Sequence, residues 1–498
     1  MKSRQFLEHH GLDRNPFADE DAQTDYVFKE HCVSVCFHPA WDKVYGDPNE
    51  PSTAIVFGRK GTGKTAMRLQ IVRHLEQFNR EHSEQRIFVV TYDNLNPFLD
   101  RFRISAGARR MPIDVLLKQW QLRDHMDAIL SIGVTQLIDF ILGDHFNGNS
   151  ISVGRLESLS RHLARDLLLL ATYYDQSKAD PVTTRWNQLR RKLRYRNLRS
   201  LLPISVGIGC SAAIIALVSL LLGQGHGNQM KGLWPWCLLL MFASWVWFGI
   251  RQLRTHWKSM GIRRSCRVLN QSVAAMRSRL LKVSSKELAS QPIPGRTGSD
   301  DRYELLSKFQ AVLASLGFQG IIVLVDRVDE PELINGAPER MKSVFWPILD
   351  NKLLKHPGLG IKLMLPAELK SFVDREDTAF YERARLDKQN MIPSFHWSAE
   401  SLLDLANSRI QACSQSKSLV TLRDLLDDDT SDERITQVLQ KMRVPRNMFK
   451  FLYRLFIGHG NTYSEHHPVW RITSGTFETE LALYEREQDA FERGVGPG

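Results

Sequence analysis

Eight consecutive residues have types and spacing that suit the binding of a phosphate chain: Gly58, Arg59, Lys60, Gly61, Thr62, Gly63, Lys64 and Thr65. They match the pattern G-x-x-x-x-G-K-[ST], in which backbone N–H groups surround the phosphates. In this pattern the lysine reaches the outer phosphates and the threonine hydroxyl binds Mg²⁺. An apolar run before the loop predicts a strand. Ala66, which also belongs to the predicted binding set, begins an amphipathic helix whose N-terminus would face the anion.

A second group of chemically capable residues lies far along the chain. Residues 320–326 form an apolar run that begins with Gly and ends with Asp326, as a buried parallel strand does at a site edge. We expect Asp326 to bind Mg²⁺, directly or through water. Asp329 or Glu330, a few positions later, could orient an attacking water as general base.

The elements that position these two groups are interrupted by a long insertion. About 260 residues separate Thr65 from Asp326, more than a compact domain needs between two core strands. Within the gap, residues 201–222 and 233–250 carry no charged side chain. Each is long enough to cross a bilayer as a helix, and tryptophans lie at or beyond both ends of the second segment. The sequence therefore predicts a transmembrane hairpin with a short turn at residues 223–232.

Basic residues flank both apolar segments, and no Asp or Glu occurs from position 181 to position 286. These cations are Arg185, Arg190, Arg191, Lys192, Arg194, Arg196 and Arg199 before the hairpin, and Arg251, Arg254, Lys258, Arg263, Arg264 and Arg267 after it. The positive-inside rule puts both flanks in the cytoplasm. We expect a two-helix protein of the cell (inner) membrane with both termini cytoplasmic, in contact with the lipid bilayer.

The formal net charge of +11 is accounted for by these flanking cations. Contact with lipid headgroups is a simpler explanation of these cations than nucleic-acid binding. Nucleic-acid binding remains a less favoured alternative for the parts of the chain outside the hairpin. The first residues lack an apolar stretch typical of a cleaved signal peptide. The six cysteines are scattered, which suits a reducing compartment.

The pattern predicts an α/β fold: a parallel sheet flanked by helices, the inserted hairpin and a C-terminal helical lid. The expected parts are an N-terminal arm (1–50), a first core half with a helical insertion (51–180), the basic-flanked hairpin (181–270), a second core half (271–395) and the lid region (396–498). Within the insertion, Asp124, His125 and Asp127 are interpreted as a solvated helix face rather than a metal site. In the hairpin, the spacing of Gly207 and Ser211 would allow close helix packing.

The loop, the D-x-x-D-E cluster at Asp326, Asp329 and Glu330, and the hairpin between them together resemble the KAP-type P-loop NTPases, of the STAND branch near the AAA+ proteins. The resemblance implies that residues 396–410 begin a helical lid. It also implies that Arg446, in the Val-Pro-Arg run, reports the nucleotide state. One departure is Pro366 after the next strand, where such proteins carry a polar sensor. Arg327, Arg383 and Arg385 are candidates for an arginine finger.

We therefore expect an ATPase that uses Mg²⁺, with ATP favoured over GTP because no N-K-x-D motif occurs. The resemblance implies a regulated switch or assembly device acting with itself as a homo-oligomer or with an unknown protein partner. Bacterial stress or phage-defence signalling is the setting that the family suggests. Two alternatives stay open: a nucleotide-binding membrane scaffold without turnover, and a membrane-tethered DNA-handling protein.

Overall fold

Five parallel strands form one sheet in the order β2-β3-β4-β1-β5. The computed structural model describes residues 3–107, 111–143, 156, 159–177, 181–197, 201–223, 227–295, 300–384, 386, 389–414, 420–464 and 466–492. The strands are β1 (Ala54–Gly58), β2 (Arg86–Tyr92), β3 (Phe318–Val325), β4 (Leu359–Pro366) and β5 (Asn390–Ile392). The strands expected before the glycine loop and at 320–326 are thus confirmed as β1 and β3, as is a parallel sheet flanked by helices.

The chain divides into two compact units. The first holds residues 1–89, 322–342 and 352–498, and the second holds 90–321 and 343–351. The division passes through β2, β3 and α15 (Pro338–Leu349). The expected boundaries at 180/181 and 270/271 both lie within the second unit.

In the first unit, β1 lies between β4 and β5 in the sheet. All five of its residues are buried, and it pairs in parallel with β4, from Ala54 opposite Lys362 to Gly58 opposite Pro366, and with β5. Apolar residues of α3 (Lys64–Glu81), among them Met67, Ile71 and Leu75, pack into the same buried cluster as the strands. The spacing of these three at i, i+4 and i+8 explains why α3 lies along the sheet.

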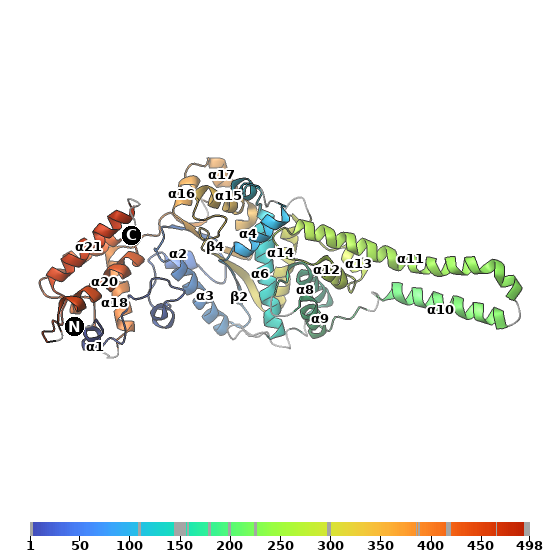
Figure 1. Cartoon of the computed structure of the whole chain (residues 1–498), viewed down its shortest axis with the longest axis horizontal. Helices are drawn as coiled ribbons and strands as arrows, with labels where there is room; N and C mark the ends of the chain where they lie inside the picture. The colour runs from blue at the N-terminus through green and yellow to red at the C-terminus, as the bar shows by residue number, and fades with distance from the viewer. Residues whose placement is uncertain are drawn as a thin grey trace. The chain divides into compact units, whose positions relative to one another are not determined.

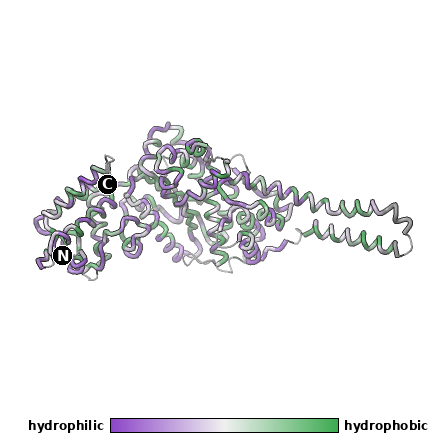
Figure 2. The backbone as a smooth tube through the Cα atoms, viewed as in Figure 1, coloured by the Kyte–Doolittle hydropathy of each residue, from purple (hydrophilic) through white to green (hydrophobic). Residues whose placement is uncertain are grey.

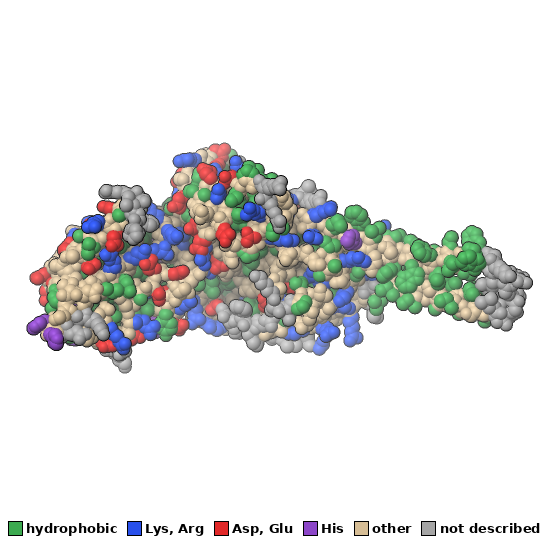
Figure 3. Space-filling model, in the orientation of Figure 1, with side chains coloured by type: hydrophobic (Ala, Val, Ile, Leu, Met, Phe, Trp, Pro, Cys, Tyr) green, Lys and Arg blue, Asp and Glu red, His purple; other side chains and the backbone are tan. Residues whose placement is uncertain are grey.

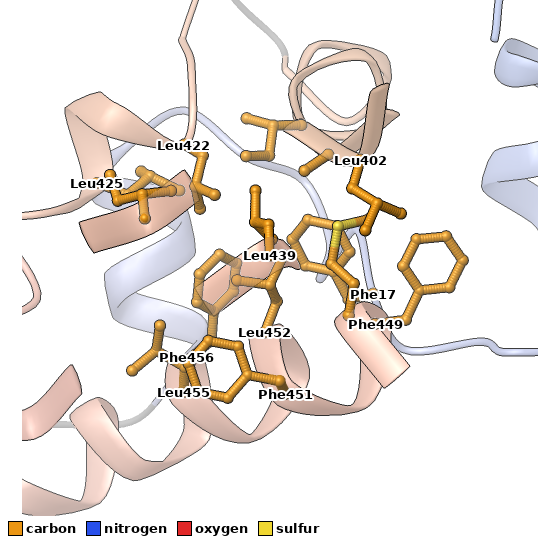
Figure 4. Close-up of a cluster of buried hydrophobic side chains, with 14 of the residues drawn as sticks. Phe17, Leu402, Leu422, Leu425, Leu439, Phe449, Phe451, Leu452, Leu455 and Phe456 are labelled. Carbon is orange, nitrogen blue, oxygen red and sulfur yellow. The ribbon is translucent and has the colours of Figure 1, made fainter. Parts of the chain in front are cut away.

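A second core in this unit joins the two ends of the chain (Figures 1 and 4). Its helices are α1 (Ser3–His9), α18 (Ala399–Ala412), α19 (Asp432–Met442), α20 (Pro445–Thr462) and α21 (Ser474–Glu492), with a π-helical turn η1 at Phe28–Cys32. Phe6 of α1 and Phe17 after it pack against Phe456 of α20. The N-terminal arm is therefore folded onto the C-terminal helices. The remaining elements of the unit are α2 (Trp41–Tyr45), α16 (Glu368–Val373), α17 (Thr378–Ala384) and the 3-10 turns η3 (Lys352–Lys355) and η4 (Arg423–Leu425).

The second unit is mainly helical. Its helices are α4 (Asn96–Ser105), α5 (Ile113–Leu117), α6 (Leu122–Leu142), α8 (Arg161–Tyr174), α9 (Val182–Lys192), α10 (Leu202–Gly223), α11 (Gly227–Ser265), α12 (Val273–Leu280), α13 (Ser285–Ala289) and α14 (Asp300–Ser315). Helix α6 packs against α8 and α14 and is apolar on most of its circumference. Such a helix belongs in a core.

The interpretation of Asp124, His125 and Asp127 as a solvated helix face is wrong, because all three side chains are fully buried in the start of α6. Both Arg302 nitrogens Nε and Nη2 donate to Asp127, each at 3.1 Å, and Arg267 pairs with Asp124 at 2.6 Å. These partners could not be recognised from the local sequence, because both arginines lie more than 100 positions away. Buried charges persist where they are paired in this way.

Three helices are long and apolar enough to cross a membrane, judged within the described residues: Leu122–Leu142, Leu202–Leu220 and Trp234–Ser265. The first window is 67% buried inside the protein, whereas the other two are 11% and 0% buried. In Figure 2 the apolar stretches of these two helices are green to white. Part of the turn predicted at 223–232 is helical, because α10 extends to Gly223 and α11 begins at Gly227.

Helices α10 and α11 run side by side as a hairpin (Figure 1). At Gly207 an added Cβ would lie 3.1 Å from Cδ2 of Trp245, so glycine lets the indole ring approach the α10 backbone. Trp245 Nε1 also donates to Ser211 Oγ at 3.1 Å. The close packing expected at Gly207 and Ser211 is therefore present, with a tryptophan as the partner.

Candidate functional site

The glycine loop lies between β1 and α3, at the carboxyl end of β1. Gly61 and Gly63 have φ values of +86° and +93°, which residues with a Cβ rarely adopt. Thr62 Oγ1 donates to the Arg59 carbonyl at 2.9 Å and closes the loop on itself. Gly63 then caps α3, so the free N–H groups of the first helical turn face the loop interior. Such an arrangement attracts anions.

Lys64 is held by the loop that it belongs to. Its Nζ donates to the carbonyl oxygens of Gly58 at 2.6 Å and Arg59 at 3.0 Å. Burial lowers the pKa of Lys64, and three carboxylates, Asp326, Asp329 and Glu368, act in the opposite direction. The ammonium group therefore lies among acidic side chains, with its hydrogen bonds directed to backbone oxygens.

Asp326 follows β3 directly and is 1% exposed. Arg68, one helical turn after Lys64 on α3, donates from Nε to Asp326 Oδ2 at 3.2 Å. The Arg68 side chain is itself almost completely buried. Sequence reasoning missed Arg68, although its position four residues after Lys64 puts both on one face of α3.

The two further carboxylates differ in their surroundings. Glu330 is exposed and pairs with Arg327 at 2.5 Å, and Arg327 also donates to Gln23 Oε1 at 2.9 Å. The hydrogen bond with Glu330 is the main cause of the raised pKa of Arg327. Arg327 has a φ of +56°, a strained conformation for a side chain with a Cβ. Asp329 is half-buried. Of the two carboxylates Asp329 and Glu330, it is the one whose charge acts on Lys64.

Arg446, at the start of α20, contacts the glycine loop through its backbone. Its N–H donates to the Gly61 carbonyl at 3.3 Å, and its Cβ would lie 2.8 Å from a Cβ added at Gly61. Its side chain pairs with Glu20 at 3.6 Å. A residue of the C-terminal helices is therefore in direct contact with the loop, and Gly61 is the position that permits it.

A cavity of about 270 Å³ brings most of these residues together. Its lining includes Lys60, Gly61, Gly63, Lys64, Thr65, Ala66, Asp326, Arg327, Asp329, Glu330 and Arg446. Gly58, Arg59 and Thr62 shape the loop without lining the cavity. Among the other arginine-finger candidates, Arg385 lies outside the described residues, and Arg383 lies in α17, where its side chain is not described.

Aromatic residues that the sequence did not single out complete the cavity wall. Trp397 Nε1 donates to the Thr62 carbonyl at 2.8 Å. His38 stacks on Phe395 at 3.7 Å between ring centroids, and its Nε2 donates to the His396 carbonyl at 2.9 Å. Burial lowers the pKa of His38 to about 4. These contacts tie the segment before β1 and the segment after β5 to the glycine loop.

The donor set fits a phosphate chain with Mg²⁺. Thr65 hydroxyl and Asp326 carboxylate supply hard oxygen ligands of the kind that Mg²⁺ takes together with phosphates and water. Within the described residues no cluster of three or more His, Cys, Asp or Glu side chains could hold a metal by itself.

Comparison with family models, curated proteins and solved structures finds no match to this chain.

Proposed function

We propose that the chain is a membrane-anchored P-loop ATPase of the KAP type, which binds and hydrolyses ATP with Mg²⁺ on the cytoplasmic side of the cell membrane. The observation that carries the proposal is the convergence of three sequence-distant groups on one cavity. These are the glycine loop with Lys64, the strand-tip Asp326, and Arg446 from the C-terminal helices. Phosphoryl transfer depends mainly on positioning and charge stabilisation, which such a set provides.

In this proposal, the loop N–H groups and Lys64 bind the phosphates, and Thr65 and Asp326 hold Mg²⁺. Bound Mg²⁺ neutralises charge on the phosphates. Asp329 is favoured over Glu330 to orient water, because Glu330 is engaged by Arg327. Helices α18–α21 act as the lid, and Arg446 couples their position to the loop, supported by its contact with Gly61.

The hairpin α10–α11 is the proposed membrane anchor, with both flanks cytoplasmic. Its support is the exposure of the apolar segments of these two helices, since only 11% and 0% of their apolar windows are buried. Water is an unfavourable environment for such a surface, and a bilayer is a favourable one. The third apolar helix, α6, is proposed to be a core helix because 67% of its window is already covered.

One observation favours a regulated switch over a constantly active enzyme. Lys64 is bound to its own loop carbonyls and Asp326 to Arg68, so both groups must change partners before they can act on ATP and Mg²⁺. The cavity of about 270 Å³ is also at the lower limit of ligand sites. A homo-oligomer or another protein would supply the signal that opens it.

The test is ATP turnover by the full-length protein in detergent, compared with Lys64→Ala, with ATP binding measured in parallel. Turnover that disappears in the variant supports the ATPase. If the unaltered protein shows neither ATP binding nor turnover, the proposal is contradicted. Binding without turnover favours the non-hydrolysing scaffold or a switch that awaits a partner or an oligomer. Where turnover is detectable, Asp329→Asn with Glu330→Gln separates an ATPase from a scaffold with negligible turnover. In an enzyme this double change lowers ATP turnover by about 100-fold or more and keeps ATP binding. In a scaffold it changes neither quantity appreciably.

A further inference from the structure

A second cavity, of about 750 Å³, lies in the helical unit and is lined almost entirely by cations. Its charged lining residues are Arg190, Arg191, Arg194, Arg196 and Lys282, and no Asp or Glu is among the described residues that line it. Five cations around one hollow repel one another in the absence of an anion. Arg190 indeed contributes to the lowered pKa of Lys282, after the larger effect of burial.

Local structure holds two of these cations, Arg190 and Lys282, in a defined arrangement. Arg190, near the end of α9, donates from Nε to the Tyr195 carbonyl at 3.1 Å, and Arg194 between them has a φ of +49°. The chain thereby folds back after α9. From the opposite wall, Lys282 Nζ donates to Asn187 Oδ1 at 2.6 Å. The turn and the cross-link therefore fix two walls of the cavity at Arg190 and Lys282.

One acidic side chain that contacts a lining residue, Tyr195, is used elsewhere. Glu287 accepts hydrogen bonds from Tyr195, Asn197 and Ser284, at 2.7–3.0 Å, and lies 3.5 Å from Arg161. By contrast, neither Arg191 nor Arg196 has an ion-pair partner among the residues that the structure describes, and both are exposed. Each of these two guanidinium groups can donate a pair of hydrogen bonds to an anion such as a phosphate.

The cavity is at the base of the apolar hairpin. Arg251, the first residue after the second uncharged segment, donates from Nη2 to the carbonyls of Leu281 and Val283, the two neighbours of Lys282. On the other side, Arg196 precedes the exposed Leu201 and Leu202 by only a few residues. In Figure 3, Lys and Arg side chains gather where the green apolar hairpin meets its unit.

We propose that this cavity binds the phosphate headgroup of an anionic phospholipid, with the acyl chains along the exposed apolar start of α10. The inference rests on the proposed membrane hairpin. It goes further than general attraction between basic flanks and lipid, because it assigns one headgroup to one cavity and to Arg191 and Arg196. A soluble phosphate shares the headgroup chemistry but gains nothing from Leu201 and Leu202.

Native mass spectrometry of the full-length protein in nonionic detergent, titrated with palmitoyl-oleoyl phosphatidylglycerol, tests this assignment. The variant is Arg191→Gln with Arg196→Gln. The matched control is Arg254→Gln with Arg264→Gln, which removes the same charge from exposed positions of α11 outside the cavity. Each cation near an anionic lipid contributes about 1 kcal/mol, so the cavity variant should weaken the first binding event by at least about tenfold. The control should change it less than about threefold, and Arg191→Lys with Arg196→Lys should keep most of the affinity.

Equal weakening in the variant and the control would overturn the proposal in favour of general surface charge. Displacement of the lipid by glycerol phosphate or inorganic phosphate at comparable concentration would overturn it in favour of a soluble anion. Flotation with liposomes and ATP binding, measured on the same samples, separate this result from the proposed function. Protein that floats and binds ATP normally, yet shows no selective loss, contradicts the headgroup cavity alone. Protein that never enters membranes contradicts the anchor and the cavity together.

Discussion

Arg68 Nε lies 3.2 Å from Asp326 Oδ2, and both side chains are nearly excluded from solvent, at 5% and 2% exposure. Two charges in such a place stabilise the fold only as a pair, because removal of one leaves the other buried without compensation. The pair also uses an oxygen that the proposed Mg²⁺ site requires. Arg68 and Mg²⁺ are therefore expected to compete for Asp326.

The first prediction concerns this competition. Arg68→Ala should lower the free energy of unfolding by about 3 kcal/mol in the absence of Mg²⁺ and nucleotide. Addition of Mg²⁺ with ATP should restore more stability to the variant than to the unaltered protein, since a cation again faces Asp326. Urea unfolding with and without Mg²⁺ and ATP measures both effects.

Arg73→Ala is the matched control for this experiment. Arg73 lies on the same helix, and its partner Glu76 is 3.9 Å away on the surface, with 54% of the Arg73 side chain exposed. Such a pair contributes about 0–1 kcal/mol. A loss at Arg68 no larger than the loss at Arg73 would contradict the buried-pair argument.

The second prediction concerns the contact between Gly61 and Arg446. Gly61→Ala would force a Cβ to within 2.8 Å of the Arg446 Cβ and would strain a φ of +86°. Because the contact links the loop to α20, we expect ATP affinity to fall by at least about tenfold. The loss combines backbone strain at position 61 with displacement of Arg446 from the loop. Isothermal titration with ATP measures it.

Gly107→Ala separates strain from contact in this comparison. Gly107 also has a positive φ, +65°, but nothing lies within 4 Å of its added Cβ. The control should lower stability slightly and leave ATP affinity unchanged. Unaltered ATP affinity in Gly61→Ala would show that α20 does not need to approach the loop.

The sequence predicts local features of this fold better than long-range pairs. The glycine loop, β1 and α3 follow from contiguous residues, and the uncharged hairpin segments follow from composition alone. The pairing of Asp326 with Arg68 does not, because the two are 258 positions apart. The same applies to Asp127, which looks like a surface acid until Arg302 is known to lie against it. Buried polar side chains resemble exposed ones in sequence, since their partners come from distant elements.

The third prediction is a pH dependence that arises from His38. Burial lowers the pKa of His38 to about 4 from the ordinary 6.5, outweighing the opposing hydrogen bond to the His396 carbonyl. The unfolded chain therefore binds more protons than the folded one between these values. Stability is fully present above pH 6.5 and is lost as the pH falls toward 4, by about 2–3 kcal/mol.

His38→Gln keeps an amide N–H that can donate to His396 and removes the titrating ring. The slope of unfolding free energy against pH, between pH 4 and 6.5, should become shallower in this variant. His125→Gln is the comparison in the other unit, since burial also lowers the pKa of His125 to about 4. If the slope stays the same in His38→Gln, the acid sensitivity arises from other groups.

The fourth prediction concerns the hairpin itself. A Cβ at Gly207 would come 3.1 Å from Trp245 Cδ2, whereas a Cβ at Gly209, on the same helix, would have nothing within 4 Å. Gly207→Val should therefore push the ring away and break the bond from Trp245 to Ser211, at a cost of about 1 kcal/mol. Gly209→Val adds the same side chain at a position with space for it, and should leave the hairpin unchanged.

Pulsed EPR on nanodisc-embedded protein reads the separation of the two helices directly. Spin labels on cysteines introduced at Ile208 and Trp247, both exposed, report α10 and α11 once the accessible native cysteines are changed to Ser. The distance distribution should lengthen or broaden in Gly207→Val and match the unaltered protein in Gly209→Val. Identical distributions in all three proteins would mean that the indole contact does not hold the hairpin together, and that its helices are kept close by the short connection alone.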